Sequence, residues 1–174
     1  IKQRSNFMIY IIIAVLLFAA DQAKKLLTVH FLNEGQSVSI IDNILDFTRC
    51  HNTGGPWSIF DQSRWIFITV TVIVLAAEIF YIKKYGPKHT LSKLSLSLIT
   101  AGALGNFVDR LFRGYVVDMI DVNFFNYPVF NFADICIVVG CVILCVYVLF
   151  IYKEPTGGKK DGEDKNGNNK TDMQ

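Results

Sequence analysis

Four long apolar stretches, separated by short polar segments, dominate the pattern of the chain. They run from about Phe7 to Leu27, Trp65 to Ile82, Leu91 to Val108 and Ala133 to Tyr152. Each approaches the roughly 20 residues that a helix needs to cross the hydrocarbon core of a bilayer. The third stretch is the most polar, because serine and threonine recur in it at helical spacing. The pattern predicts four transmembrane helices.

The segment between the first and second stretches has a different pattern. Residues 36–41 and 44–48 are short runs rich in β-branched residues, separated by Asp42 and Asn43. Such runs around a turn are typical of a β-hairpin. The predicted fold class is therefore an α-helical integral membrane protein with four transmembrane helices. A small extracytoplasmic β-sheet is expected between helices 1 and 2, within about residues 28–64.

The distribution of lysine and arginine orients the chain. Basic residues lie in or beside the loop between the second and third spans, in the C-terminal tail, and at Lys2 and Arg4. Since basic loops remain in the cytoplasm, we expect both termini there and the connections 28–64 and 109–132 outside. Lys24 and Lys25, at the outer end of the first span, depart from this rule. We expect them to pair locally with Asp21.

The chain divides into two regions by composition. Residues 1–154 are expected to form one membrane domain that includes the β segment. Residues 155–174 are rich in glycine, asparagine, lysine and aspartate, with little to bury, and are expected to be a disordered cytoplasmic tail. The first apolar stretch is followed by a poor cleavage site, so we interpret it as a retained span and not as a signal peptide.

Charge and cysteine content narrow the function classes. The formal net charge of +2 is too small to indicate a nucleic-acid partner. Cys50 stands alone, and the other three cysteines lie in the fourth span without CxxC spacing. They are expected to be buried free thiols. No histidine has the spacing of a metal ligand, so we expect neither a metal site nor an organic cofactor.

Polar side chains gather at the outer ends of the spans. Asp21 ends the first, Asn52 precedes the second, Asp109 and Arg110 close the third, and Asp134 opens the fourth. Ionisable groups at membrane depth are costly and usually face a protein interior or a wet cavity. The topology puts them at corresponding depths, so their convergence on one site is feasible.

Asp118 and Asp134 are the strongest candidates for chemistry. Each is flanked by apolar residues that would desolvate its carboxylate. Two such carboxylates close together share a proton near neutral pH. The ionised member can then take a proton from water while the protonated member polarises a peptide carbonyl. The pattern is therefore that of an aspartic peptidase.

Other interpretations stay open on the residues alone. Asp134 also suits a helix N-terminus, where the helix dipole favours a carboxylate. Asp109 and Arg110 are typical of a structural ion pair, and Glu78 in the second span is expected to snorkel toward the cytoplasmic end. A Ser–Lys dyad built on Lys93 is disfavoured by its cytoplasmic position. A non-enzymatic membrane carrier, or a cytoplasm-facing prepilin-type aspartic peptidase, is a further alternative.

Five motifs occur in an order that resembles the lipoprotein signal peptidase (signal peptidase II) family. They are Asp21-Gln22-x-x-Lys25, Asn52-Thr53-Gly54, Gly105-Asn106-x-x-Asp109-Arg110, Val116-Val117-Asp118 and Phe130-Asn131-x-Ala133-Asp134. Together they cover the chain from the first span to the fourth. Five motifs in order make this resemblance specific.

The resemblance implies a bacterial inner-membrane aspartic endopeptidase with an extracytoplasmic active site. Such an enzyme removes the signal peptide from diacylglyceryl-modified prolipoproteins, cleaving on the N-terminal side of the lipidated cysteine. Globomycin-type cyclic peptides inhibit the family, and membrane lipid surrounds the site. The catalytic pair falls on Asp118 and Asp134. Supporting residues fall on Asp21, Lys25, Asn52, Gly54, Asn106, Asp109, Arg110 and Asn131.

One segment departs from the family pattern. Small residues, often Ala-Ala, usually follow the Asn-Thr-Gly motif, whereas this chain has Gly55-Pro56-Trp57. Proline fixes φ and removes a backbone donor. We therefore expect different backbone hydrogen bonds in this loop, with no consequence for the aspartate pair.

Overall fold

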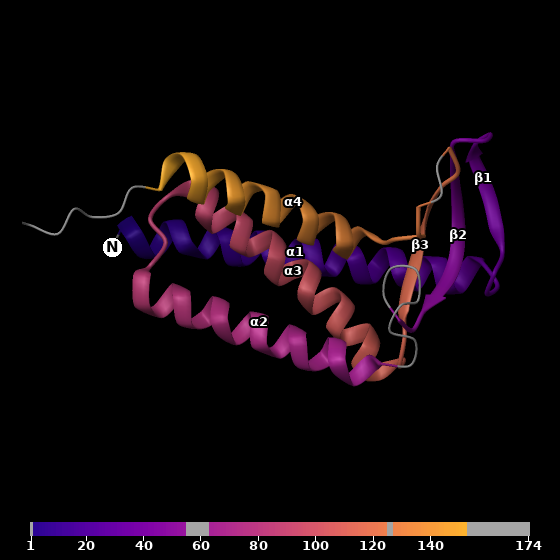
Figure 1. Ribbon diagram of the computed structural model, residues 1–174, viewed down its shortest axis with the longest axis horizontal. Helices are drawn as coiled ribbons and strands as arrows, with labels where there is room; N and C mark the ends of the chain where they lie inside the picture. The colour runs from indigo at the N-terminus through magenta and orange to yellow at the C-terminus, as the bar shows by residue number, and fades with distance from the viewer. Residues whose placement is uncertain (1, 55–62, 125–126, 153–174) are drawn as a thin grey trace, which may run out of the picture.

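Four helices lie along one another and a small sheet stands at one end of them (Figure 1). The computed structural model describes residues 2–54, 63–124 and 127–152, with side chains from residue 7 onward. The helices are α1 (Lys2–Phe31), α2 (Arg64–Tyr85), α3 (Thr90–Phe112) and α4 (Phe132–Val146), and α4 continues as a π-helix, η2 (Tyr147–Ile151). All four are long and apolar enough to cross a membrane, which confirms the four predicted spans.

The helices differ in how much of their surface the protein covers. Half of the apolar window of α3 is buried, against 6% for α1 and 11% for α2 and α4. The reason is that α3 packs against all three other helices. This central position explains the polar character of its sequence, since Ser92, Ser95 and Ser97 are buried against neighbouring helices and not exposed to lipid. The remaining apolar surface of α1, α2 and α4 is available to face lipid.

Glycines bring α3 and α4 into close contact. A Cβ atom at Gly102 would collide with the carbonyl oxygen of Ala133, and one at Gly105 would collide with the carboxylate of Asp21. Small residues at such positions allow helix backbones to approach closely. As a result, the first turn of α4 is held directly against α3 and α1.

The sheet has three antiparallel strands in the order β1 (Ser37–Ile41), β2 (Leu45–Asn52) and β3 (Val116–Val122). The first two confirm the predicted hairpin, with Asn43 in the turn at a φ of 60°, a conformation that asparagine tolerates. The third strand comes from the connection between α3 and α4 and was not predicted. It places Asp118 opposite Cys50 on β2.

Two expectations about single side chains are wrong. Glu78 does not snorkel to the membrane edge, because it is 8% exposed and faces a cavity between helices. All four cysteines are free, as expected, but Cys141 and Cys145 are exposed on α4 instead of buried. The Gly55-Pro56-Trp57 segment and the tail from residue 153 lie outside the described residues, so the predictions made for them stay predictions.

Candidate active site

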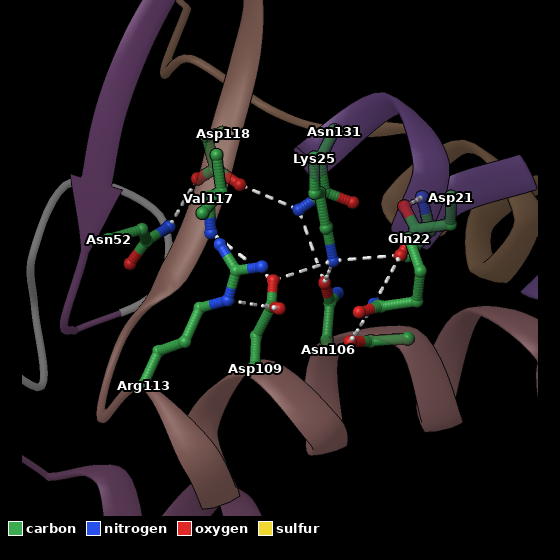
Figure 2. A network of polar contacts seen from close by, with 12 residues as sticks. Asp21, Gln22, Lys25, Asn52, Asn106, Asp109, Arg113, Val117, Asp118 and Asn131 are labelled. Carbon is green, nitrogen blue, oxygen red and sulfur yellow. Dashed lines mark hydrogen bonds and ion pairs between the residues drawn. The ribbon is translucent and has the colours of Figure 1, made fainter. Parts of the chain in front are cut away.

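The site lies where the sheet meets the ends of the helices that are nearest to it (Figure 2). Asp21 and Lys25 come from α1, and Asn106, Asp109 and Arg110 come from α3. Asn52 ends β2, Asp118 lies on β3, and Asn131 and Asp134 open α4. The structure thus brings together side chains from five elements that are far apart in sequence. Gly54 contributes through its backbone, since its N–H donates to Asn52 Oδ1 over 3.2 Å.

Lys25 is the centre of a buried group of charges. Its Nζ lies 2.9 Å from Asp21 Oδ2 and 3.0 Å from Asp109 Oδ2, and it donates to Asn106 Oδ1 over 3.0 Å. Lys25 and Asp109 are fully buried, and Asp21 is nearly so. We call Lys25, Asp21, Asp109 and Asn106 the Lys25 cluster. The expected pairing of Asp21 with a neighbouring lysine is confirmed for Lys25.

The carboxylates of this cluster also fix the backbone of other elements. Asp21 Oδ1 accepts a hydrogen bond from the N–H of Ala133 in α4 over 2.9 Å. Asp109 Oδ2 accepts one from the N–H of Val117 in β3 over 3.3 Å. Buried charges are stable only when they are paired and hydrogen-bonded. The Lys25 cluster therefore fastens α1, α3, β3 and the start of α4 to one another.

Asp109 does not form the ion pair with Arg110 that the sequence suggested. Its second cation is Arg113, whose Nε lies 3.5 Å from Asp109 Oδ1. Arg110 instead lies with its guanidinium group 4.3 Å from the centre of the Phe67 ring. The difference follows from helical geometry, because residues four apart share a face and adjacent residues do not.

Asp118 is held by two asparagine side chains. It is 1% exposed. Asn131 Nδ2 donates to its Oδ1 over 2.6 Å, and Asn52 Nδ2 donates to its Oδ2 over 2.8 Å (Figure 2). A short β-bridge between Ile120 and Phe130 brings Asn131 alongside β3.

Asp134 has both a helix-capping role and a place in the site. Its backbone N–H donates to Asn131 Oδ1 over 3.1 Å, and its Oδ2 accepts from the Asn131 N–H over 3.1 Å, which completes a capping box. The remaining oxygen, Oδ1, accepts from Asn106 Nδ2 over 2.7 Å. The helix-opening interpretation of Asp134 is therefore correct but incomplete.

Two asparagines, Asn106 and Asn131, connect the Lys25 cluster to Asp118 and Asp134 in a fixed orientation. Asn106 Oδ1 accepts from Lys25 Nζ and from Asn131 Nδ2, so its Nδ2 must face Asp134. Asn131 Oδ1 accepts from a backbone N–H, so its Nδ2 must face Asp118. Lys25 and backbone amides can only donate, and this fixes which amide atom points where. Asp118 and Asp134 thus receive neutral amide donors.

The environment of Asp118 raises its pKa to about 7. Burial is the largest cause, because it disfavours the charged carboxylate, and the negative charge of Asp134 adds to it. The hydrogen bonds from Asn52 and Asn131 and the charge of Lys25 act in the opposite direction without cancelling the rise. Asp118 therefore keeps its proton up to about neutral pH.

Both aspartates line a cavity of about 500 Å³ between α2, α3 and α4, which we call the aspartate cavity. Arg110 lines it beside them, and Arg110 interacts electrostatically with both carboxylates. Away from these polar groups the walls are apolar, with Val70 and Val74 on one side and Val138 on the other. A cavity with a polar end and a long apolar wall suits an apolar peptide segment with one reactive bond at its end.

Two residues that belong to the site were not predicted from the sequence. Arg113 was not singled out, although its position four residues after Asp109 on a helix is a recognisable signal for an ion pair. Thr28, fully buried at the C-terminal half of α1, donates to Met119 Sδ over 3.5 Å and packs α1 against β3. That contact spans residues far apart in sequence and left no local signal.

A comparison with known protein families identifies the family of this chain. A family profile described as signal peptidase (SPase) II matches residues 13–150. The chain belongs to the signal peptidase II family. Membership implies a peptidase of bacterial membranes that removes lipoprotein signal peptides.

Two solved structures agree with this assignment to the signal peptidase II family, and both are described as bacterial membrane enzymes. The first, at 2.3 Å resolution, is 33% identical with a TM-score of 0.76, over 80% of this chain and 87% of that one. The second, at 1.9 Å resolution, is 32% identical with a TM-score of 0.75, over 82% of this chain and 94% of that one. The match thus extends over most of both chains.

Proposed function

We propose that this chain is an aspartic endopeptidase that cleaves diacylglyceryl-modified prolipoproteins on the N-terminal side of the lipidated cysteine. Asp118 and Asp134 are its catalytic residues. One observation carries the proposal. Both carboxylates line one cavity, and within the described ranges neither forms an ion pair with a lysine, arginine or histidine. They are free to exchange protons with a substrate.

The reaction follows from the single proton of the pair. Asp134, ionised, takes a proton from a water molecule, whose oxygen adds to the scissile carbonyl carbon. Asp118, protonated, donates to the carbonyl oxygen and stabilises the tetrahedral intermediate. The proton on Asp134 then passes to the amide nitrogen as the C–N bond breaks. Asp118 regains its proton when the carbonyl re-forms, so the pair returns to its starting state.

The supporting residues hold the two carboxylates in place. Asn52 and Asn131 orient Asp118, and Asn106 orients Asp134. Gly54 fixes the side chain of Asn52 through its backbone N–H. Asp21, Lys25 and Asp109 keep α1, α3 and the start of α4 together beneath them. Arg110 supplies a positive charge beside the cavity, suited to orienting a substrate carbonyl.

The substrate and the topology follow from the apolar walls and from the lysine distribution. The signal peptide lies along the aspartate cavity, and the two acyl chains of the lipidated cysteine lie in the surrounding bilayer. Both termini are cytoplasmic in the bacterial inner membrane, and the site faces outward. Globomycin-type cyclic peptides compete for the same cavity.

The test is cleavage of a diacylated prolipoprotein by the purified protein in lipid. We expect cleavage directly before the lipidated cysteine, and inhibition by globomycin. The matched control is the same substrate without the diacylglyceryl group, which we expect to remain uncut. No cleavage of the lipidated substrate, as for a membrane carrier, or equal cleavage of both substrates, would overturn the proposal.

The proposed orientation of the chain in the membrane can be tested separately. A single cysteine placed at Asn123, in the connection between α3 and α4, should react in intact cells with a membrane-impermeant maleimide after Cys50 has been replaced by serine. The same substitution at Lys88, in the loop between α2 and α3, should react only after the membrane is opened. The reverse pattern would support a cytoplasm-facing peptidase instead.

A further inference from the structure

A second cavity of about 450 Å³ lies between α1, α2 and α3. Its walls come from residues 7–18 of α1, 75–82 of α2 and 93–104 of α3. In Figure 1 this is the half of the bundle near the N-terminus, at the far end from the sheet. The second cavity is therefore separate from the site at Asp118 and Asp134, and the two share no lining residue.

The lining of the second cavity is mostly apolar, with the hydroxyl groups of Ser97 and Thr100 and two ionisable side chains among it. One is Lys93, close to the start of α3, whose Nζ lies 5.6 Å from the centre of the Tyr10 ring. The other is Glu78 on α2, deeper along the bundle. The second cavity thus has a cationic mouth, long hydrocarbon walls and one carboxyl group in the wall.

Glu78 is left incompletely satisfied. It is 8% exposed, it interacts with Thr100 on α3, and its Oε1 has no hydrogen-bond partner among the described residues. A polar atom without a partner is costly within a bilayer. As a carboxylic acid, Glu78 has one O–H donor. The carboxyl group therefore points to an occupant with a carbonyl acceptor below the level of Lys93, as the glycerol esters of a lipid have.

The length and charge of the second cavity favour a lipid chain over a protein helix. From Lys93 to Leu104 the axis of α3 rises about 16 Å. This is about half of the roughly 30 Å hydrocarbon core of a bilayer, and therefore the depth of one leaflet. A lipid with its phosphate at Lys93 places one acyl chain along the length of the cavity, whereas an apolar helix of a partner or of a second copy supplies no anion at Lys93.

We propose that the second cavity binds one glycerophospholipid, with an acyl chain between α1, α2 and α3 and the phosphate at Lys93. The proposed lipid site also adjoins the cavity of the proposed peptidase. Adjacent residues of α2 line the two cavities, Val74 the aspartate cavity and Leu75 the second one. Because α2 packs chiefly against α3, the bound lipid helps to set its distance from α1.

Native mass spectrometry of the purified full chain in detergent tests this directly and does not depend on peptidase activity. With added dioleoyl phosphatidylglycerol, the wild-type protein should retain one lipid more tightly than the rest. Lys93→Gln should weaken that first binding step about fivefold, the value of one basic residue at a lipid phosphate. Lys88→Gln, which removes a lysine of the same loop outside the cavity, should leave it unchanged.

A second pair of variants tests the acyl chain. Ala14 lies in the wall of the second cavity, so Ala14→Trp should fill it and abolish the tight step. Ala77, exposed on α2 away from the cavity, provides the matched control, and Ala77→Trp should retain it. Dioleoylglycerol, which lacks the phosphate, should bind the wild type only as well as phosphatidylglycerol binds the K93Q variant. Millimolar inorganic phosphate should not displace the lipid.

Several outcomes would overturn the proposal. They are equal lipid binding by all variants, no tightly retained lipid on the wild type, or displacement by phosphate alone. A dimer that disappears in the Ala14→Trp variant would show that a second copy covers the groove. Failure of prolipoprotein cleavage would leave these binding results untouched, so the two proposals fail separately.

Discussion

Two pairs of aspartates lie at the same end of this molecule and are used in opposite ways. Asp21 and Asp109 share the ammonium group of Lys25 at 2.9 and 3.0 Å, and they also accept backbone hydrogen bonds. Asp118 and Asp134 receive amide donors instead and line an open cavity. Both members of the first pair lie at ion-pair distance from one lysine. Among the described residues, neither member of the second pair has a cation at that distance, and we propose that this pair shares a mobile proton.

The difference shows what separates a structural carboxylate from a reactive one in a dry environment. A lysine at contact distance favours the ionised form of a carboxylate and so opposes the effect of burial. An amide donor orients a carboxylate without supplying charge, so burial and the neighbouring carboxylate decide the pKa. Asn106 stands between the two pairs, since it accepts from Lys25 and donates to Asp134.

The largest expected effect is a loss of cleavage rate when either aspartate of the second pair, Asp118 or Asp134, can no longer exchange a proton. Asp118→Asn and Asp134→Asn should each lower the rate of prolipoprotein cleavage at least 10³-fold, since a general acid or base is lost. Asp121→Asn on the same strand is the matched control and should stay within about twofold of the wild type, because Asp121 is bonded to Thr48 outside the cavity. Normal turnover in either dyad variant would refute the proposed chemistry.

The next largest effect is a loss of stability when the first pair, Asp21 and Asp109, loses its lysine. Lys25→Met should lower the free energy of unfolding by about 3–5 kcal/mol, because Asp21 would be left buried without an ion-pair partner and Asp109 would keep only Arg113, at 3.5 Å. Thermal unfolding in detergent measures this. Lys24→Met next to it should change stability by about 1 kcal/mol at most, the value of its cation–π contact with Phe132. Equal effects of the two substitutions would mean that the Lys25 cluster is not what holds the helices together.

A change in pH dependence is expected from Asn52→Ala. The reaction needs protonated Asp118, so the rate should fall as the pH rises through the Asp118 pKa of about 7. The hydrogen bond from Asn52 lowers that pKa, and its removal should therefore move the alkaline limb of the rate profile to higher pH. Asp121→Asn is again the control, and the alkaline limb of its rate profile should stay where it is in the wild type. A shift of the Asn52→Ala limb to lower pH would contradict the assignment of the proton.

The smallest effect is expected at the edge of the Lys25 cluster. Arg113 is partly exposed and lies 3.5 Å from Asp109, so Arg113→Gln should cost about 1 kcal/mol or less. The pH profile of cleavage should not change, because the guanidinium group faces the first pair and not the second. If the alkaline limb of the rate profile moves in this variant, the charge of Arg113 acts on Asp118 as well as on Asp109. The two pairs of aspartates would then not be electrostatically separate.

The sequence predicted the helices and the hairpin because both leave local signals. Continuous apolar stretches fix the spans, and the β-branched runs around Asp42 and Asn43 fix β1 and β2. The ends were placed within a few residues, with α1 extending to Phe31 instead of Leu27. The third strand was missed because Val116–Val122 pairs with a strand about 70 residues away, and such long-range pairing leaves no periodicity in the strand itself.

The same limit applies to the site. The ordered motifs named residues that the structure brings together, yet no sequence pattern says that Lys25 bridges Asp21 and Asp109, or that Asn106 joins the two pairs. Sequence adjacency even suggested the wrong partner for Asp109. Glu78 was misplaced for a related reason, since its burial depends on a cavity formed by three helices and not on its position along α2.

The central claim is that Asp118 holds the shared proton near neutral pH. Infrared spectroscopy of the protein with isotope-labelled aspartate carboxyls measures this without substrate. We predict a protonated-carboxyl band that disappears with a midpoint at about pH 7 and that is missing from the Asp118→Asn variant. A band that persists in that variant, or one that disappears near the ordinary pKa of aspartate, about 4, would contradict the account.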